Sequence, residues 1–213
     1  MEPPVQSITE EPYLRPYLRA AREHGGGFNS LLWATQKSQR QRFDAICRIH
    51  ELAGKSVLDA GCGRADFLGY LIDTKTRISD YIGVEAVDAL ATEAEARNYP
   101  NCKIVRGDFV REPARLFVGA DVIVFSGSLN TIDSTGFYET LSRAFDAAAE
   151  AVVFNFLSSS VLAGRDYLVW HRPEHVMSFL RRLPCTVVTH TDYLEGDQTI
   201  AVVKNPEKSL PEP

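Results

Sequence analysis

Short apolar runs alternate with stretches of helical periodicity along most of the chain. The runs are KSVLDA, DYIGVE, CKIVRG, ADVIVFS and AVVFNFL at residues 55–60, 80–85, 102–107, 120–126 and 151–157. The spacing between them predicts helices over about 65–72, 89–98, 135–149 and 173–183. Continuous apolar strands that alternate with helices are typical of a parallel sheet covered on both faces. The sequence therefore predicts a doubly wound, Rossmann-like α/β fold.

The last two apolar runs break this alternation. The runs CTVVTHTDYL and QTIAVV, residues 185–194 and 198–203, are separated only by Glu195, Gly196 and Asp197. A connection this short holds no crossover helix, so the pattern predicts an antiparallel hairpin.

The regions outside the alternating pattern predict the limits of one domain. Apolar positions at helical spacing predict a helix over 29–52 that stops at Gly54, just before the first strand. Residues 1–28 mix Pro, Glu and Arg with three consecutive glycines, which favours a partly flexible, partly helical arm, an appendage to the domain. We expect the domain to span 29–204 and residues 205–213 to form a disordered tail.

Composition and charge narrow the class of protein. The chain has 213 residues, of which 45% are hydrophobic, and 23 basic against 28 acidic side chains give a net charge of −5. These values indicate an ordinary globular domain without a basic surface for nucleic acid. The four cysteines form no C-x-x-C pair, the N-terminus lacks the apolar core of a signal peptide, and no apolar run approaches membrane-spanning length. We expect a cytoplasmic protein that binds neither nucleic acid nor membrane.

One strand-to-helix turn carries the most information about chemistry. In VLDAGCGRADFLGYL, residues 57–71, a buried strand ends in Asp59 and turns through Gly61 and Gly63 into a helix. Glycine lets a ligand approach the backbone closely, and a helix start offers N–H groups without intrahelical partners. The turn predicts a site for a polar ligand, although any tight strand-to-helix turn can also use glycine.

Three acidic residues follow three successive predicted strands. Asp59, Glu85 and Asp108 stand at their carboxyl ends, which is the edge where open α/β sheets bind ligands. A carboxylate at the position of Glu85 can accept both hydroxyls of a ribose. Asp108 can accept the amino group of an adenine, and Phe109 or Val87 can cover the face of that base. Glu85 alone could be a solvated acid at a strand end, but the three acids together indicate a ligand site at this edge.

These features together resemble the class I S-adenosylmethionine-dependent methyltransferases over residues 29–204. The resemblance rests on D-A-G-C-G at 59–63, Glu85, G-D-F at 107–109 and the final hairpin. The segments LLWATQKSQRQRF and VVFNFLSS are also similar to small bacterial members without an assigned substrate. The resemblance implies a sheet of seven strands in the order 3-2-1-4-5-7-6 with the last strand antiparallel, S-adenosyl-L-methionine as cofactor, and methyl transfer. Ala65 departs from the pattern, because many members have a third glycine there.

The resemblance also implies roles for individual residues. The loop from Gly61 to Gly63 would pack against the methionine part of the cofactor, Glu85 would hold the ribose, and Asp108 with Phe109 would hold the adenine. Gln39 and Arg42 are candidates for the methionine carboxylate, since a guanidinium can grip a carboxylate with two hydrogen bonds, but a solvated basic helix face explains them equally well. The implied cofactor-binding set is Asp59, Gly61, Cys62, Gly63, Glu85, Ala86, Asp108, Phe109, Ser126 and Arg42.

Methyl transfer from a sulfonium is an in-line displacement, for which alignment and exclusion of water supply most of the catalysis. If the acceptor needs a base, the candidates are His171, Asp133 and Tyr167. Asn130 follows the fourth predicted strand, and Asn155 stands near the end of the fifth. Both can face the cofactor or the acceptor there, although capping of loops is an equal alternative.

The acceptor itself is predicted from what the chain lacks. A chain without a large inserted domain favours a small molecule, methylated on oxygen or nitrogen, in a pocket closed by the N-terminal helix and residues 158–170. Tyr167 and Trp170 can wall that pocket. His171 and His175 are four residues apart, but Pro173 favours a helix start that leaves His171 outside, so no metal site is predicted.

Two other functions share parts of this pattern. A nicotinamide-dependent oxidoreductase would have the same glycine turn and downstream acid, but Asp66 stands where its third glycine belongs. A binding protein that keeps the cofactor pocket without catalysis is the second alternative, since methyl transfer requires no signature nucleophile.

Overall fold

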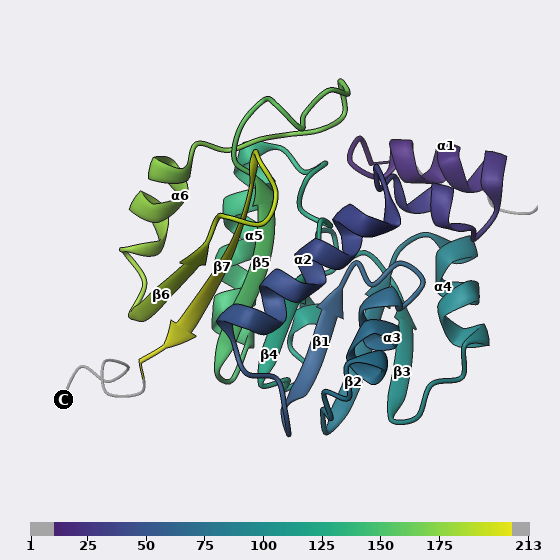
Figure 1. Cartoon of the computed structure of the whole chain (residues 1–213), viewed down its shortest axis with the longest axis horizontal. Coiled ribbons are helices and arrows are strands. Elements are labelled where there is room, and N and C mark those ends of the chain that lie inside the picture. The colour runs from purple at the N-terminus through teal and green to yellow at the C-terminus, as the bar shows by residue number, and fades with distance from the viewer. Residues whose placement is uncertain (1–10, 206–213) are drawn as a thin grey trace, which may run out of the picture.

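The computed structural model describes residues 11–205, and its centre is a seven-stranded sheet (Figure 1). The strands are β1 Ser56–Ala60, β2 Asp80–Glu85, β3 Cys102–Arg106, β4 Val122–Phe125, β5 Ala151–Leu157, β6 Cys185–His190 and β7 Asp197–Lys204. Their order across the sheet is β3-β2-β1-β4-β5-β7-β6. Strand β7 pairs antiparallel with both β5 and β6, whereas β1 to β5 pair in parallel. The predicted fold class, strand order and final hairpin are confirmed.

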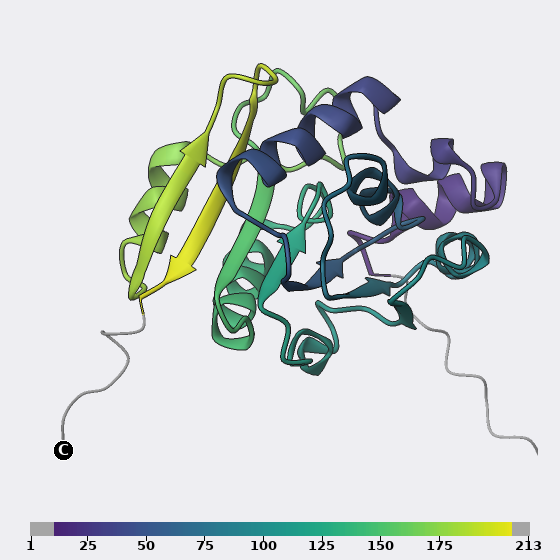
Figure 2. The same cartoon turned by 60° about the horizontal axis from the view of Figure 1, so that its bottom comes forward.

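Helices cover both faces of the sheet, as Figure 2 shows with α2 above it and α5 below. The helical elements are α1 Arg15–His24, η1 Phe28–Leu31, α2 Gln36–Ile49, α3 Asp66–Asp73, α4 Asp88–Ala96, η2 Pro113–Leu116, α5 Ser134–Ala147 and α6 Pro173–Leu180. Side chains of a strand alternate between the two faces. Leu58 and Ile123 therefore join the core under α5 and α6, whereas Val57 and Val122 join the core under α2 and α3.

Helix α2 begins later than the sequence predicts. The predicted helix over 29–52 is instead a 3₁₀ turn, a residue in the left-handed region, Leu32 with φ 58°, and then α2. Thr35 sets this start through a capping box, because its Oγ1 accepts from the backbone N–H of Ser38 at 3.0 Å while Ser38 Oγ accepts from the Thr35 N–H. The helix ends at Ile49, before Gly54.

Helix α1 is part of the folded body. Tyr13, just before it, packs against the core that α5 covers, and Ser30 Oγ donates to the backbone oxygens of Ala20 and Gly25. The expectation that the arm is an appendage is therefore wrong for residues 11–28. Residues 1–10, and the predicted disordered tail beyond residue 205, lie outside the described residues.

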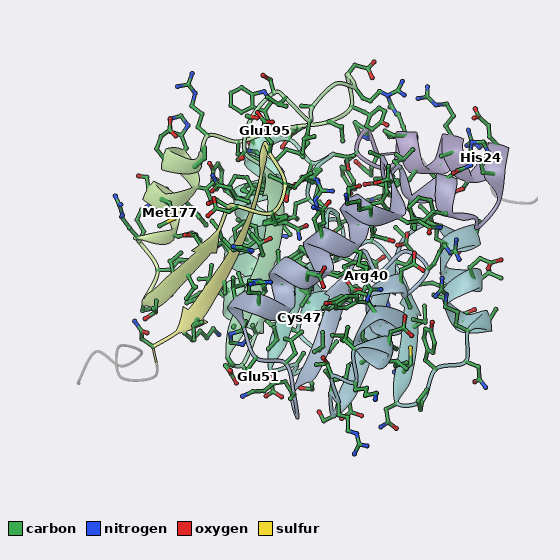
Figure 3. The ribbon with its side chains drawn as sticks, viewed as in Figure 1. His24, Arg40, Cys47, Glu51, Met177 and Glu195 are labelled. Carbon is green, nitrogen blue, oxygen red and sulfur yellow. The ribbon has the colours of Figure 1, made fainter. Side chains whose placement is uncertain are left out.

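Three segments that are distant in sequence gather above the carboxyl ends of β1 to β5 (Figure 1). They are α1, residues 158–172 between β5 and α6, and the turn between β6 and β7, where Glu195 is labelled in Figure 3. The four cysteines are free thiols. Between residues 11 and 205, every helix is too short or too polar to cross a bilayer.

Candidate active site

A cavity of about 260 Å³ lies over the carboxyl ends of the parallel strands. One part of its wall, the glycine-loop half, comes from the ends of β1, β2 and β3 and contains Gly61, Gly63, Glu85, Ala86, Val87 and Phe109. A second part of the lining, the leucine half, contains Tyr17, Trp33, Asn130, Thr131, Leu157, Leu162, Leu168 and Leu194. The two halves differ in their origin along the chain, and the charged side chain of Glu85 belongs to the first.

The turn after β1 is held open by two glycines. Gly61 and Gly63 have φ of 80° and 57°, values that favour glycine. The Gly61 N–H donates to the backbone oxygen of Val84 at 2.8 Å, and the Gly63 N–H donates to Glu85 Oε2 at 2.8 Å. Ala65, at the position of the third glycine, also takes a left-handed conformation with φ 56°. Ala65 therefore adopts a backbone conformation that favours glycine.

Glu85 is the buried carboxylate at the end of β2, and 7% of it is exposed. Its Oε1 accepts from the Val87 N–H at 2.7 Å, while Oε2 accepts from Gly63. Burial raises the pKa of Glu85, and these backbone donors act against that rise. Each carboxylate oxygen can accept a second hydrogen bond, so Glu85 can still bind hydroxyl groups in the cavity.

Asp59 is a buried carboxylate with one oxygen unpaired. Its Oδ2 accepts from the Tyr81 hydroxyl at 2.6 Å, whereas Oδ1 is buried without a hydrogen-bond partner among the described residues. Burial raises the pKa of Asp59 to about 7. Asp59 lines a small pocket with Gly61, Cys62, Gly63 and Ser126 behind the glycine loop. A cationic group there would satisfy Oδ1 and stabilise the ionised form.

Asp108, at the end of β3, already has three donors. Its Oδ1 accepts from the backbone N–H groups of Val110 and Arg111 at 2.9 and 3.3 Å, and Oδ2 accepts from the Tyr13 hydroxyl at 2.7 Å. An adenine amino group would share Oδ2 with Tyr13. The neighbouring Phe109 lines the cavity and meets Phe125 edge-on, with ring centroids 5.5 Å apart.

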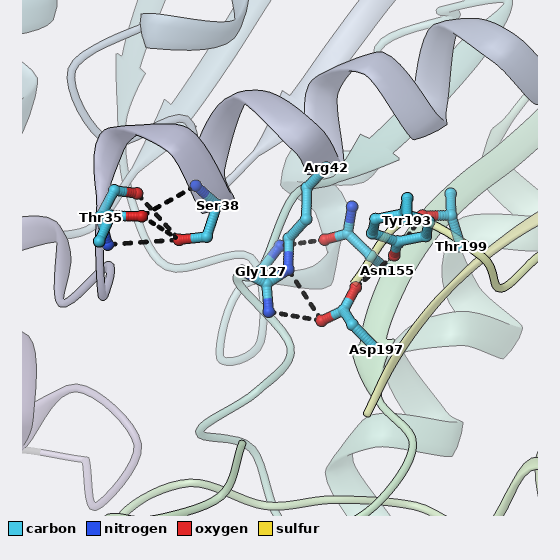
Figure 4. A network of polar contacts seen from close by, with 8 residues as sticks. All are labelled: Thr35, Ser38, Arg42, Gly127, Asn155, Tyr193, Asp197 and Thr199. Atoms are coloured by element: carbon cyan, nitrogen blue, oxygen red, sulfur yellow. Dashed lines mark hydrogen bonds and ion pairs between the residues drawn. The ribbon is translucent and has the colours of Figure 1, made fainter. Parts of the chain in front are cut away.

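Arg42 lies at the cavity wall in a buried ion pair (Figure 4). Its Nε and Nη2 donate to Asp197 Oδ2 at 2.8 and 2.5 Å, and its guanidinium lies 4.8 Å from the ring centroid of Trp33. Asp197 also accepts from the Tyr193 hydroxyl. A methionine carboxylate bound by Arg42, the predicted role, would therefore compete with Asp197 for the guanidinium. The other candidate, Gln39, donates to Asp66 at 3.2 Å.

Residues 157–168 and the turn before β7 supply the four leucines of the leucine half. This segment is attached through backbone bonds, in which the Val169 N–H donates to the Asn130 oxygen at 2.7 Å and the His171 N–H donates to the Leu157 oxygen at 2.9 Å. The side-chain Oδ1 of Asn130 is buried without a partner among the described residues. Asn155, by contrast, accepts from the Gly127 N–H at 2.8 Å through its Oδ1.

The three candidate bases lie outside the central cavity lining. His171 precedes α6 as predicted, is buried, and stacks on Phe137 with ring centroids 3.9 Å apart. Burial lowers its pKa to about 4. Asp133 is exposed and caps α5 by accepting from the Gly136 N–H at 2.8 Å. Tyr167 lines a separate groove beside α1.

Sequence reasoning missed the side chains that the arm supplies. Tyr13, Leu14 and Tyr17 all line the cavity, and the hydroxyl of Tyr17 hydrogen-bonds Thr131. The i, i+4 spacing of the two tyrosines followed by Ala20 and Ala21 is a signal of an amphipathic helix. That signal was available in the sequence and indicates a buried face on α1.

Comparisons with solved structures identify the fold. The chain is similar to the DhpI protein in complex with SAH, with a TM-score of 0.67, 14% identity and coverage of 92% of this chain and 96% of that one. It is similar to magnesium protoporphyrin IX methyltransferase from Synechocystis PCC 6803 with bound SAM, with a TM-score of 0.63, 14% identity and coverage of 79% and 80%. It is also similar to the small RNA methyltransferase HEN1, with a TM-score of 0.64, 13% identity and coverage of 83% and 26%.

No family model matches the sequence, and no curated protein matches it. The structural similarities nevertheless establish that the chain has the fold of the class I S-adenosylmethionine-dependent methyltransferases.

Proposed function

We propose that this protein binds S-adenosyl-L-methionine and transfers its methyl group to a small-molecule acceptor. The observation that carries the proposal is the pair of buried carboxylates beside the glycine loop. Asp59 offers an unpaired Oδ1 to a cationic amino group, and Glu85 offers two oxygens to ribose hydroxyls. Two of the similar structures described above contain SAM or SAH, which supports the same ligand here.

The residues of the chain fit the parts of this cofactor. Gly61 and Gly63 line the cavity with backbone atoms, Phe109 and Val87 provide apolar walls for a base, and Ser126 has a buried hydroxyl without a partner among residues 11–205. The bound cofactor would supply an electrophilic methyl group on a sulfonium. The chain then contributes by aligning an acceptor in the leucine half and by excluding water.

The form of the cavity favours a small acceptor. Helix α1 and residues 157–168 line it together, so it is bounded by side chains on the side away from the sheet. The net charge of −5 offers no general attraction to nucleic acid, although one similar structure is an RNA methyltransferase. We also propose that residues 29–204 are the methyltransferase domain, to whose cavity residues 13, 14 and 17 add their side chains, and that it acts in the cytoplasm.

Calorimetric titration with S-adenosylhomocysteine tests the proposal, with NAD as the comparison ligand. We expect micromolar binding of the first ligand and none of NAD. Asp59→Asn should weaken the binding about tenfold or more, because a charge-assisted hydrogen bond is lost. Asp121→Asn is the matched control, since Asp121 accepts from Ser56 at the opposite end of β1. Binding of NAD alone would favour the oxidoreductase, and tight binding without turnover of any acceptor would favour a non-catalytic binding protein.

A further inference from the structure

The leucine half contains no side chain suited to take a proton. Among residues 11–205, the titratable groups lining the cavity are Tyr13, Tyr17, Arg42 and Glu85. Tyr13 donates to Asp108, and burial raises the pKa of Tyr17 to about 12. Arg42 is paired with Asp197, and Glu85 belongs to the glycine-loop half. An alcohol or phenol, which must lose a proton as it reacts, therefore finds no base in this half.

The same half disfavours an acceptor that carries a negative charge. Its walls are mainly leucine and tryptophan side chains, and burial of an unpaired carboxylate in apolar surroundings is costly. The guanidinium of Arg42 is the one cationic group in the lining formed by residues 11–205, and Asp197 already accepts from it twice.

Asn130 indicates which chemical group the acceptor carries. It lines the cavity, is 8% exposed, and its Oδ1 is buried without a partner among the described residues. A buried amide oxygen without a donor costs free energy, so it indicates a ligand group that donates. Its backbone oxygen accepts from Val169, which fixes Asn130 beside the segment that brings Leu168 into the cavity.

We propose that the methyl acceptor is an apolar aromatic amine, uncharged at neutral pH, whose N–H donates to Asn130 Oδ1. This inference rests on the proposed methyltransferase function and deepens it. The hydrogen bond to Asn130 holds one N–H, so the nitrogen lone pair is free to point toward the glycine-loop half. The lone pair forms the bond to the methyl carbon, the carbon–sulfur bond breaks with its electron pair remaining on sulfur, and the N-methylated cation then loses its proton to water.

Matched aromatic series test the acceptor class. For binding, the protein saturated with S-adenosylhomocysteine is titrated with 1-naphthylamine, 1-naphthol and 1-naphthoate. For methylation, a panel of twenty aromatic scaffolds with one or two rings is assayed with S-adenosylmethionine, each scaffold carrying in turn an amino, a hydroxyl or a carboxylate group. We expect binding and methylation of amines to exceed those of the matched hydroxyl and carboxylate compounds by tenfold or more.

Variants of Asn130 test its positioning role. Asn130→Leu should lower kcat/KM for the amine about tenfold or more and leave S-adenosylhomocysteine affinity within twofold. Asn130→Asp keeps an accepting oxygen and should retain amine binding. Methylation of hydroxyls or carboxylates instead of amines, no methylation of any amine, or an unchanged Asn130→Leu variant would overturn the inference. Methylation of another acceptor in those cases, with S-adenosylhomocysteine binding retained, would leave the proposed function standing.

Discussion

The two halves of the cavity take their polar atoms from different parts of the chain. At the glycine-loop half, the ends of β1 and β2 supply Gly63 and Glu85, and Asp59 lines the small adjoining pocket, all within 27 residues of chain. In the leucine half, residues from α1, β5, the segment after it and the β6–β7 turn meet around one unpaired amide oxygen. Under the proposed function, the sheet fixes the residues that contact the cofactor. Substitutions in the leucine half can therefore change which acceptor fits without altering the cofactor contacts.

The halves also respond to pH with opposite sign. The folded state raises the pKa of Asp59 to about 7, so the stability that its protonated form contributes is lost as pH rises from about 4 through 7. His171, whose backbone N–H donates to Leu157 of the leucine half, has its pKa lowered to about 4, so stability is lost as pH falls below the ordinary value of 6.5. Between about pH 4 and pH 7, a rise in pH therefore weakens the contribution of Asp59 to stability, and a fall in pH weakens that of His171.

The largest expected effect comes from Glu85→Ala. It removes the acceptor for the Gly63 and Val87 N–H groups together with the proposed ribose contacts. We expect S-adenosylhomocysteine affinity to fall about 100-fold, or about 3 kcal/mol, in calorimetric titration. Glu112→Ala, which removes a surface ion pair with Arg115, is the control. Affinity within threefold of the unmodified protein for Glu85→Ala would contradict the assignment.

His171→Phe should reduce the acid sensitivity of the fold. When the pH falls from 7 to 5, the free energy of unfolding falls by about 2 kcal/mol, because the unfolded chain takes up a proton that the buried, neutral imidazole of His171 does not. The variant keeps a ring against Phe137 and should lose that part of the pH dependence in urea unfolding. The exposed His175 provides the control, through His175→Gln. Parallel pH profiles for both variants would refute this explanation.

A smaller effect is expected from the hydrogen bond between Tyr13, just before α1, and Asp108, just after β3. A double-mutant cycle with Tyr13→Phe and Asp108→Asn isolates the hydrogen bond from the tyrosine hydroxyl to Oδ2. We expect a coupling of about 1 kcal/mol in the free energy of unfolding. Strict additivity of the two changes would mean that this bond does not hold α1 in place.

The smallest effect is a proton released on binding. At pH 7 an Asp59 carboxyl with a pKa of about 7 is half protonated, and a bound ammonium group would ionise it. Titration of S-adenosylhomocysteine in buffers of different ionisation enthalpy should show release of about half a proton. Asp59→Asn should abolish the release. An equal release from that variant would show that a group other than Asp59 loses the proton.

The sequence predicted the sheet and the glycine-loop half because both depend on local patterns. Apolar runs locate the strands, and the residues that end them must lie at one edge of a parallel sheet. The start of α2 was missed because the capping box of Thr35 and Ser38 outweighs the apolar positions before it. The pairing of Arg42 with Asp197 joins residues 155 positions apart, so no local pattern indicates it.

A crystal structure with bound S-adenosylhomocysteine tests the central claim most directly. The account predicts ribose hydroxyls within about 3 Å of the Glu85 carboxylate, the amino group at Asp59 Oδ1, and the sulfur facing the leucine half. A ligand bound outside this cavity, or one turned so that its base lies against Leu162 and Leu168, would contradict it.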